Sequence, residues 1–172
     1  MSTSVPDFSQ LSSLCKDAEF TAVADAIGRE ISKLMSVDLD EVALLKVERQ
    51  HLRFIYPAKL MEVGTIPLTT AGSTAVRCAL NRRPELSNNF AQARHASIFE
   101  AVDLGTQSKS FGDSGKAIIQ KMMTVPVVVQ NKSVAVLQVC RKGTSRQATG
   151  PDFSPADLRK LTDIAALVAT CK

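Results

Sequence analysis

The feature that most constrains the fold is a pair of β-branched runs, residues 124–129 and 134–140. The polar residues 130–133 between them are typical of a turn, so the pattern predicts an antiparallel hairpin. Neither run alternates regularly between apolar and polar residues, which indicates a sheet that is covered on both faces. This hairpin is expected to lie at the centre of the core.

Helical periodicity marks the first part of the chain. Apolar residues recur at helical spacing over residues 17–35, with Asp17 as the predicted N-cap. Gly28 is costly in a helix interior, so it predicts a close contact with a neighbouring element. We expect residues 1–16 to form a leading segment or short helix, and residues 17–172 to form a single domain.

A second helix is predicted over residues 154–170. Ser154 is a strong N-cap and Pro155 follows it at the first helical position. An amphipathic stripe then begins at Leu158 and continues toward the C-terminus.

The middle of the chain predicts shorter elements. Extended segments are expected at residues 42–47, 52–56 and 64–68, with the last at an edge of the sheet. A helix follows Ser73, with one face formed by Val76, Ala79 and Leu80. The Gly-, Ser- and Asp-rich residues 103–115 predict a long loop of the kind that is often functional.

Composition excludes several classes of protein. With 172 residues, 45% of them hydrophobic and 22% charged, the chain is typical of one globular domain. It has no apolar run of the roughly 20 residues that a membrane span needs and no signal-peptide pattern, so a cytoplasmic location and no membrane contact are expected. The net charge of +4 is dispersed, which argues against nucleic-acid binding.

Cysteine and histidine usage points away from metal and redox chemistry. The 4 cysteines are scattered and the 2 histidines are far apart, so no metal site is predicted and the thiols are expected to stay reduced. Phosphate-binding, esterase, metalloprotease and dinucleotide motifs are all missing, and we therefore expect no enzymatic activity.

The order of these elements predicts an α+β domain with an antiparallel sheet. On that background the chain resembles a GAF domain, a sensory module related to PAS domains. The phrases that carry the resemblance are Gly-Ser-Thr-Ala-Val at 72–76, Asn-Arg-Arg-Pro at 81–84, Met-Thr-Val-Pro-Val at 123–127, Ser-Val-Ala-Val-Leu-Gln-Val at 133–139 and Asp-Phe-Ser at 152–154.

Two departures from the family pattern concern its details. Ala135 stands where the family often has Gly, and the Asn-Lys-Phe-Asp-Glu phrase of cyclic-nucleotide GAF domains is missing. The second departure makes cyclic GMP or cyclic AMP a less expected ligand.

The resemblance implies a central sheet of five or six strands with the N- and C-terminal helices on one face. In the family that face commonly pairs with a second subunit, so a homodimer is expected. The other face would carry a small-molecule pocket, roofed here by residues 74–81 and 88–102. No cofactor is specified. Free methionine sulfoxide reductases share the fold and use several cysteines, but their pattern does not map onto Cys78 and Cys140.

Each candidate pocket residue has an alternative structural reading. Cys78 suits a covalent chromophore or a redox sensor, or an inert buried thiol. His95 suits a haem ligand, or a histidine that is hydrogen-bonded or on the surface. Gln138 suits a pocket, or a cross-strand hydrogen bond. Arg77 suits an anionic ligand, or a solvated helix surface. Asn88, Asn89 and Phe90 could supply amide hydrogen bonds and a stacking face to a planar ligand, or the asparagines could serve as turn residues. Asn81 and Phe99 complete the candidate set.

Two functions are consistent with these expectations. One is a sensory or regulatory domain that binds a small molecule and signals through dimer or partner helices, by ordering the 103–115 loop. The other is a dimerisation or protein-interaction module without a ligand.

Overall fold

The computed structural model of the chain describes residues 6–91 and 117–172, and these form helices on both sides of one antiparallel sheet. The six strands have the order β3-β2-β1-β6-β5-β4. This agrees with the predicted α+β architecture of five or six strands. The strands are β1 Val42–Glu48, β2 His51–Tyr56, β3 Thr65–Pro67, β4 Glu85–Ser87, β5 Ile118–Val129 and β6 Lys132–Gly143.

The predicted hairpin is the centre of the sheet. Strand β6 lies between β1 and β5, and its residues from Ala135 to Cys140 are all buried. The prediction of a four-residue turn was wrong, because only Gln130 and Asn131 form it. Both have positive φ, 48° and 62°, as in the two-residue turns whose twist matches that of paired strands. Pairing therefore continues to Val129 and Lys132 at the tip.

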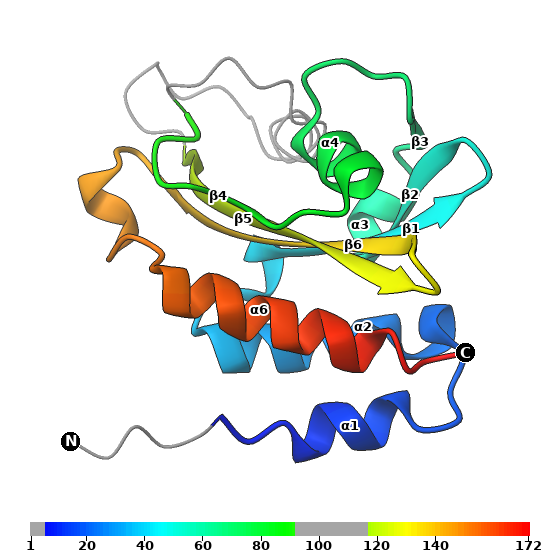
Figure 1. Cartoon of the computed structure of the whole chain (residues 1–172). Helices are drawn as coiled ribbons and strands as arrows, with labels where there is room; N and C mark the ends of the chain where they lie inside the picture. The colour runs from blue at the N-terminus through cyan, green and yellow to red at the C-terminus, as the bar shows by residue number, and fades with distance from the viewer. Residues whose placement is uncertain (1–5, 92–116) are drawn as a thin grey trace.

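Three helices cover one face of the sheet (Figure 1). Helices α2, Phe20–Met35, and α6, Pro155–Val168, lie against the strands, and α1, Ser9–Cys15, packs on both helices from outside. Leu11 and Cys15 of α1 are fully buried there. The two long helices were predicted on this face; that α1 covers them was not.

Local capping explains where the two long helices begin. The Ser154 hydroxyl accepts a hydrogen bond from the Asp157 N–H at 3.1 Å, and the Asp157 carboxylate accepts one from the Ser154 N–H at 2.7 Å. This capping box confirms the predicted start of α6. The prediction that Asp17 is the N-cap of α2 was wrong. Asp17 has a φ of 59° in the turn after α1, so the Glu19 carboxylate caps α2 instead, accepting from Ala22 N–H at 3.1 Å.

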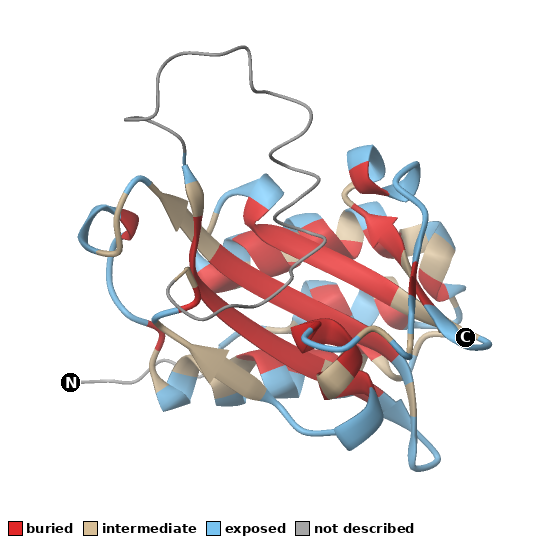
Figure 2. Cartoon of the chain, turned by 90° about the horizontal axis from the view of Figure 1, so that it is seen from above, coloured by how far each residue is buried: buried red, intermediate tan, exposed pale blue. Residues whose placement is uncertain are grey.

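Helix α4, Thr74–Asn81, lies on the opposite face of the sheet (Figure 1). It closes a second core, in which the buried side chains include Leu45, Phe54, Cys78 and Phe90. Seen from above, buried residues run continuously along the central strands (Figure 2). Both faces of the sheet are thus covered, as the apolar runs of the hairpin predicted.

Two smaller elements differ from expectation. A short helix, α3 Ala58–Met61, follows β2 and buries Leu60; it was not predicted because four residues carry no periodic signal. Short 3-10 turns occur at Leu39–Glu41 and Gln147–Thr149.

Across residues 6–91 and 117–172, no helix combines the length and apolar character needed to cross a membrane.

Candidate functional site

Helix α4 is held in place at both ends by polar contacts. Ser73 caps its start, accepting a hydrogen bond from Val76 N–H at 3.3 Å. At its end, the Ser133 hydroxyl donates to the Ala79 carbonyl at 2.7 Å, and the Arg82 guanidinium donates to the Asn131 carbonyl at 3.2 Å. Since Asn131 and Ser133 belong to the tip of the central hairpin, α4 has a defined position on the sheet.

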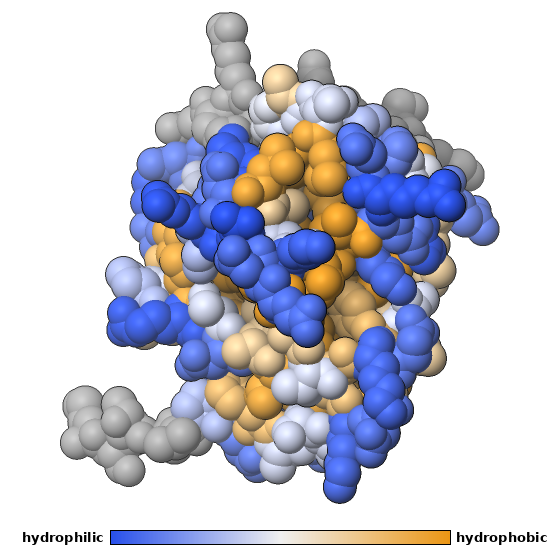
Figure 3. Space-filling model, turned by 45° about the vertical axis from the view of Figure 1, so that its right-hand side comes forward, coloured by the Kyte–Doolittle hydropathy of each residue, from blue (hydrophilic) through white to orange (hydrophobic). Residues whose placement is uncertain are grey.

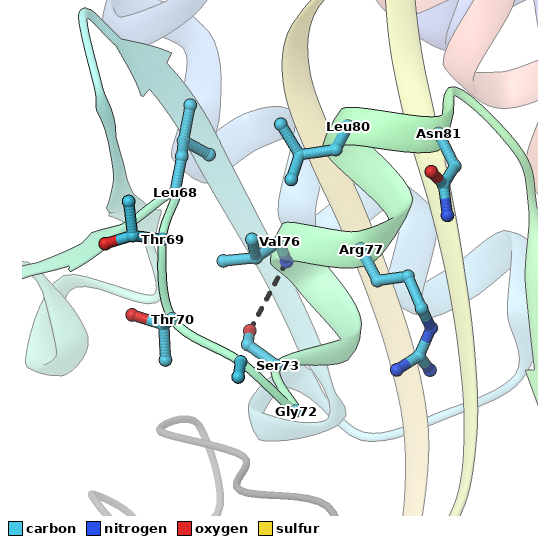
Figure 4. Close-up of a pocket in the computed structure, with 10 residues that line it drawn as sticks. Leu68, Thr69, Thr70, Gly72, Ser73, Val76, Arg77, Leu80 and Asn81 are labelled. Carbon is cyan, nitrogen blue, oxygen red and sulfur yellow. Dashed lines mark hydrogen bonds between the residues drawn. The ribbon is translucent and has the colours of Figure 1, made fainter.

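A groove of about 290 Å³ lies between α4 and the segment that leads into it (Figure 4). Apolar side chains of Leu68, Val76 and Leu80 line part of it. Figure 3, which brings this side of the molecule forward, shows apolar side chains gathered between hydrophilic ones. The polar residues of the groove are Thr69, Thr70, Ser73, Arg77 and Asn81.

The solvent side of α4 explains the apolar part of the groove. Leu80 was predicted to share one face of the helix with Val76 and Ala79, and the structure shows that its exposure differs from theirs. Leu80 is 56% exposed, whereas Val76 and Ala79 are buried. The sheet side of α4 is occupied by Ala75 and Cys78, which leaves Leu80 to face outward into the groove.

Arg77 lines the groove but already has a carboxylate partner. Its guanidinium donates to both carboxylate oxygens of Glu85, at 2.8 Å and 2.6 Å, and Glu85 lies in the edge strand β4. The same hydrogen bonds raise the pKa of Arg77. This bidentate pair joins α4 to the edge of the sheet, so Arg77 presents little unbalanced charge to an anion.

Cys78 and Phe90 lie inside the second core rather than in the groove. The Cys78 side chain is fully buried, and burial raises the pKa of its thiol to about 12. Phe90 is 2% exposed, and its N–H donates to the Gln120 carbonyl at 2.9 Å. A thiol that is buried and protonated is a poor nucleophile, so the geometry favours the inert alternative for Cys78.

Gln138 makes a cross-strand contact on the α4 side of the sheet. Its neighbours at alternate positions, Val136 and Cys140, belong to the core beneath α4, and its side-chain amide donates to the Thr124 hydroxyl at 3.3 Å. Both residues are buried and directly paired between β5 and β6. The cross-strand alternative is therefore the one that the structure displays.

One further polar group beside this core has no partner. Among the residues that the structure describes, the buried side-chain atoms without a hydrogen bond are Thr74 Oγ1 and Arg141 Nε. Thr74 is the first residue of α4 and is 8% exposed. A buried hydroxyl without a partner is costly, which makes Thr74 a candidate contact for a polar ligand atom.

Of the asparagine candidates, only one lies in the groove. Asn81 is exposed and lies in the groove, whereas Asn89 is exposed and does not line it. Its neighbour Asn88 has a structural role that the sequence did not reveal. The Asn88 side chain donates to the Phe153 carbonyl at 3.0 Å and accepts from Phe153 N–H at 2.9 Å, which holds the chain before α6.

His95 and Phe99 lie outside the described residues, as does the predicted loop at 103–115. The structure thus brings Arg77 and Asn81 together in the groove, and places Cys78, Phe90 and Gln138 in the core on the other side of α4. No cluster of metal-ligating side chains occurs within the two described segments.

Sequence reasoning missed the segment that leads into α4. Leu68, Thr69 and Thr70 line the groove, yet they were interpreted only as an edge piece and its continuation. The available signal was Gly72 followed by Ser73, a turn and a cap that direct this segment along the helix. Gly72 has a φ of +83°, a conformation that favours glycine.

Comparisons with known proteins support a single fold. The chain is similar to a methyl-accepting chemotaxis protein fragment, residues 122 to 287, with 15% identity over 94% of this chain and 93% of that one and a TM-score of 0.68. It is similar to the GAF domain of a phosphoenolpyruvate-protein phosphotransferase from Coxiella burnetii, with 6% identity, coverage of 93% and 86%, and a TM-score of 0.68.

An enzyme has the same fold. The reduced form of fRMsr from Staphylococcus aureus shares 18% identity over 98% of this chain and 97% of that one, with a TM-score of 0.59. At these identities the likeness shows the fold alone. No curated protein matches the chain.

The family is shown by sequence as well as by structure. The profile of the GAF domain matches residues 19–171, which is nearly the whole chain and includes both long helices, the sheet and α4. GAF domains are commonly sensory or regulatory modules. The chain belongs to the GAF domain family.

Proposed function

We propose that this protein is a sensory or regulatory GAF domain that binds a small molecule beside α4. The observation that carries the proposal is the groove of about 290 Å³ between α4 and the segment before it, which is lined by both apolar and polar residues. Ligand sites in proteins are typically concave, apolar in part, and supplied with a few polar groups.

The lining selects the kind of ligand. The volume is at the lower end of the range for small-molecule sites, so it suits a compact metabolite. Leu68, Val76 and Leu80 offer an apolar surface, and the lining also contains the polar residues Thr69, Thr70, Ser73 and Asn81. Because Arg77 is paired with Glu85, a neutral or zwitterionic molecule fits better than a strong anion.

Native mass spectrometry of freshly purified protein tests the proposal first, because it reports a retained molecule and the subunit count together. A panel of small metabolites is then screened for a rise in melting temperature. The matched variants are Leu80→Ala, in the groove, and Leu39→Ala, an exposed leucine that does not line it. We expect Leu80→Ala to weaken binding of any stabilising metabolite at least several-fold and Leu39→Ala to leave it unchanged.

The second candidate function is a ligand-free dimerisation or interaction module. The observation that favours it is that four of the described pocket candidates serve the protein itself: Cys78 and Phe90 fill the core, Gln138 bonds Thr124, and Arg77 bonds Glu85. This function predicts that no metabolite raises the melting temperature and that Leu80→Ala instead disrupts a protein complex.

A homodimer through the terminal helices is part of the proposal. Helix α1 covers part of the face formed by α2 and α6, and no large hydrophobic side chain of these three helices is exposed within their described residues. A pairing surface of this kind is polar, so we expect a dimer that weakens as the protein is diluted or salt is added. Light scattering after size exclusion, at two salt concentrations, measures this.

We further propose that signalling, rather than catalysis, is the activity of this chain. The burial and raised pKa of Cys78 argue against a thiol nucleophile at that position. Incubation with free methionine sulfoxide and a thiol reductant should yield no methionine above the rate without protein.

A cytoplasmic location, expected from the sequence, stays a prediction that cell fractionation tests.

A further inference from the structure

The first and last helices bring two cysteines together. Cys15 is the last residue of α1 and is fully buried, and Cys171 follows α6 and is partly exposed. Both belong to the same apolar cluster. The Cys171 side chain is a neighbour of the Cys15 thiol, and burial, together with this neighbour, raises the pKa of Cys15 to about 12.

Backbone hydrogen bonds hold the second cysteine at this place. The Lys172 N–H donates to the Ala18 carbonyl at 2.9 Å, and the Phe20 N–H donates to the Lys172 carbonyl at 3.0 Å. The Cys171 N–H donates to the Val168 carbonyl at 3.1 Å, which continues the turn that ends α6. Figure 1 shows the C-terminus beside the link between α1 and α2. The proximity of the two thiols therefore results from a fixed backbone rather than from a mobile tail.

We propose that Cys15 and Cys171 form an oxidation site, at which a low-molecular-weight disulfide converts the two thiols into one intramolecular disulfide that joins α1 to the end of α6. The thiols are otherwise far apart in sequence and in no recognisable motif. Because α1 packs on α2 and α6, the bond holds α1 over the face that these two helices present.

The oxidation takes two thiol–disulfide exchange steps, and the exposure of the two cysteines indicates which of them reacts first. The Cys171 thiolate attacks one sulfur of the disulfide RS–SR, the S–S bond breaks, and one RS⁻ leaves and takes up a proton. The Cys15 thiol then loses its proton and attacks the Cys171 sulfur, which expels the second RS⁻. The two cysteines lose two electrons and the reagent gains them, so RS–SR becomes two RSH. Cys15 acts second because it is buried and protonated, and it reacts only once the neighbouring Cys171 carries the mixed disulfide beside it.

The experiment uses the full chain and glutathione disulfide as the probe. We expect the intact mass to fall by two hydrogens, and peptide mapping to show Cys15 bonded to Cys171 and no change at Cys78 or Cys140, which are fully buried. The oxidised protein should melt several degrees above the reduced one, because the bond closes nearly the whole chain into a loop and restricts the unfolded state.

Two variants separate the site from nonspecific oxidation. Cys171→Ser should abolish both the mass change and the rise in melting temperature. Cys15→Ser should trap glutathione on Cys171. If this variant fails to fold, the comparison of Cys171→Ser with wild type still tests whether the internal disulfide forms. A persistent glutathione adduct on Cys171 of the wild type, or a bond between Cys171 residues of two chains in place of the internal one, overturns the proposal.

Discussion

The Tyr56 ring lies directly against Gly28, so that a Cβ atom at position 28 would come within 2.5 Å of Tyr56 Cε1. Gly28 is in the middle of α2 and Tyr56 ends β2, so the missing side chain sets how closely the helix approaches the sheet. The Tyr56 hydroxyl donates to the Leu39 carbonyl at 3.0 Å, which fixes the ring. The close contact predicted for Gly28 is confirmed.

Gly28→Ala is therefore expected to destabilise the protein, although alanine is the better helix former. The steric conflict with Tyr56 should outweigh the roughly 1 kcal/mol gained in helix propensity and leave a net loss of about 1–3 kcal/mol. Urea unfolding measures the free energy of unfolding. Ala22→Gly, at an exposed position of the same helix, is the control and should cost only about 1 kcal/mol. A stabilised Gly28→Ala protein would contradict the packing argument.

Asp152 is expected to make stability depend on pH in the acid range. Its carboxylate accepts from Arg146 at 2.6 Å and lies 3.0 Å from the ammonium of Lys121, whose side chain is only 3% exposed. The hydrogen bond from Arg146, and then that from Lys121, lower the pKa of Asp152. A carboxyl whose pKa is lower in the folded state stabilises the fold above its unfolded pKa of about 3.9, and this stabilisation is lost as the pH falls through the folded value.

The test is Asp152→Asn, with melting temperatures recorded from neutral pH down to about pH 3. The variant should melt below wild type at pH 7, and the difference should shrink as the pH falls below about 4. Asp163→Asn, at an exposed position of α6, should show little difference at either end. A gap that stays constant across this range would contradict the assignment to Asp152 ionisation.

Cys78 is expected to resist alkylation in the folded protein. A thiol with a pKa near 12 has about a thousandfold less thiolate near neutral pH than an ordinary cysteine, and the Cys78 side chain is fully buried as well. Iodoacetamide should modify Cys171 first and Cys78 only after unfolding. Time-resolved peptide mapping follows both residues in one sample. Labelling of Cys78 as fast as Cys171 would show that the space beneath α4 opens, which would revive a reactive thiol.

For the buried pair Gln138 and Thr124, replacing one residue should destabilise the protein more than replacing both. Thr124→Val removes the hydroxyl at 3.3 Å and leaves the Gln138 amide buried without that partner, which should cost about 1–3 kcal/mol. Replacing both, as Thr124→Val with Gln138→Leu, should recover most of the loss, because no polar group is then left unpaired. Chemical denaturation of wild type, Thr124→Val, Gln138→Leu and the double variant closes the cycle. A loss in the double variant equal to the sum of the two single losses would exclude the coupling.

Much of the fold was determined by local sequence. The β-branched runs required a sheet, their lack of alternation required cover on both faces, and Ser154 with Pro155 marked where α6 begins. These features depend on residues close in the chain, so the sequence alone specifies them. The turn at Gln130 and Asn131 was placed correctly but made too long, because its backbone conformation depends on pairing of the flanking residues.

The candidate site was decided by tertiary structure. Which side of α4 faces the sheet separates Arg77, Asn81 and Leu80 in the groove from Cys78 in the core, and helical periodicity over eight residues is too short to settle that orientation. The pairing of Arg77 with Glu85 and the meeting of Cys15 with Cys171 join residues that no local pattern relates. Such contacts arise only when packing of the two faces brings distant elements together, which is why the sequence determined the sheet and its cover while the assembled structure determined the groove.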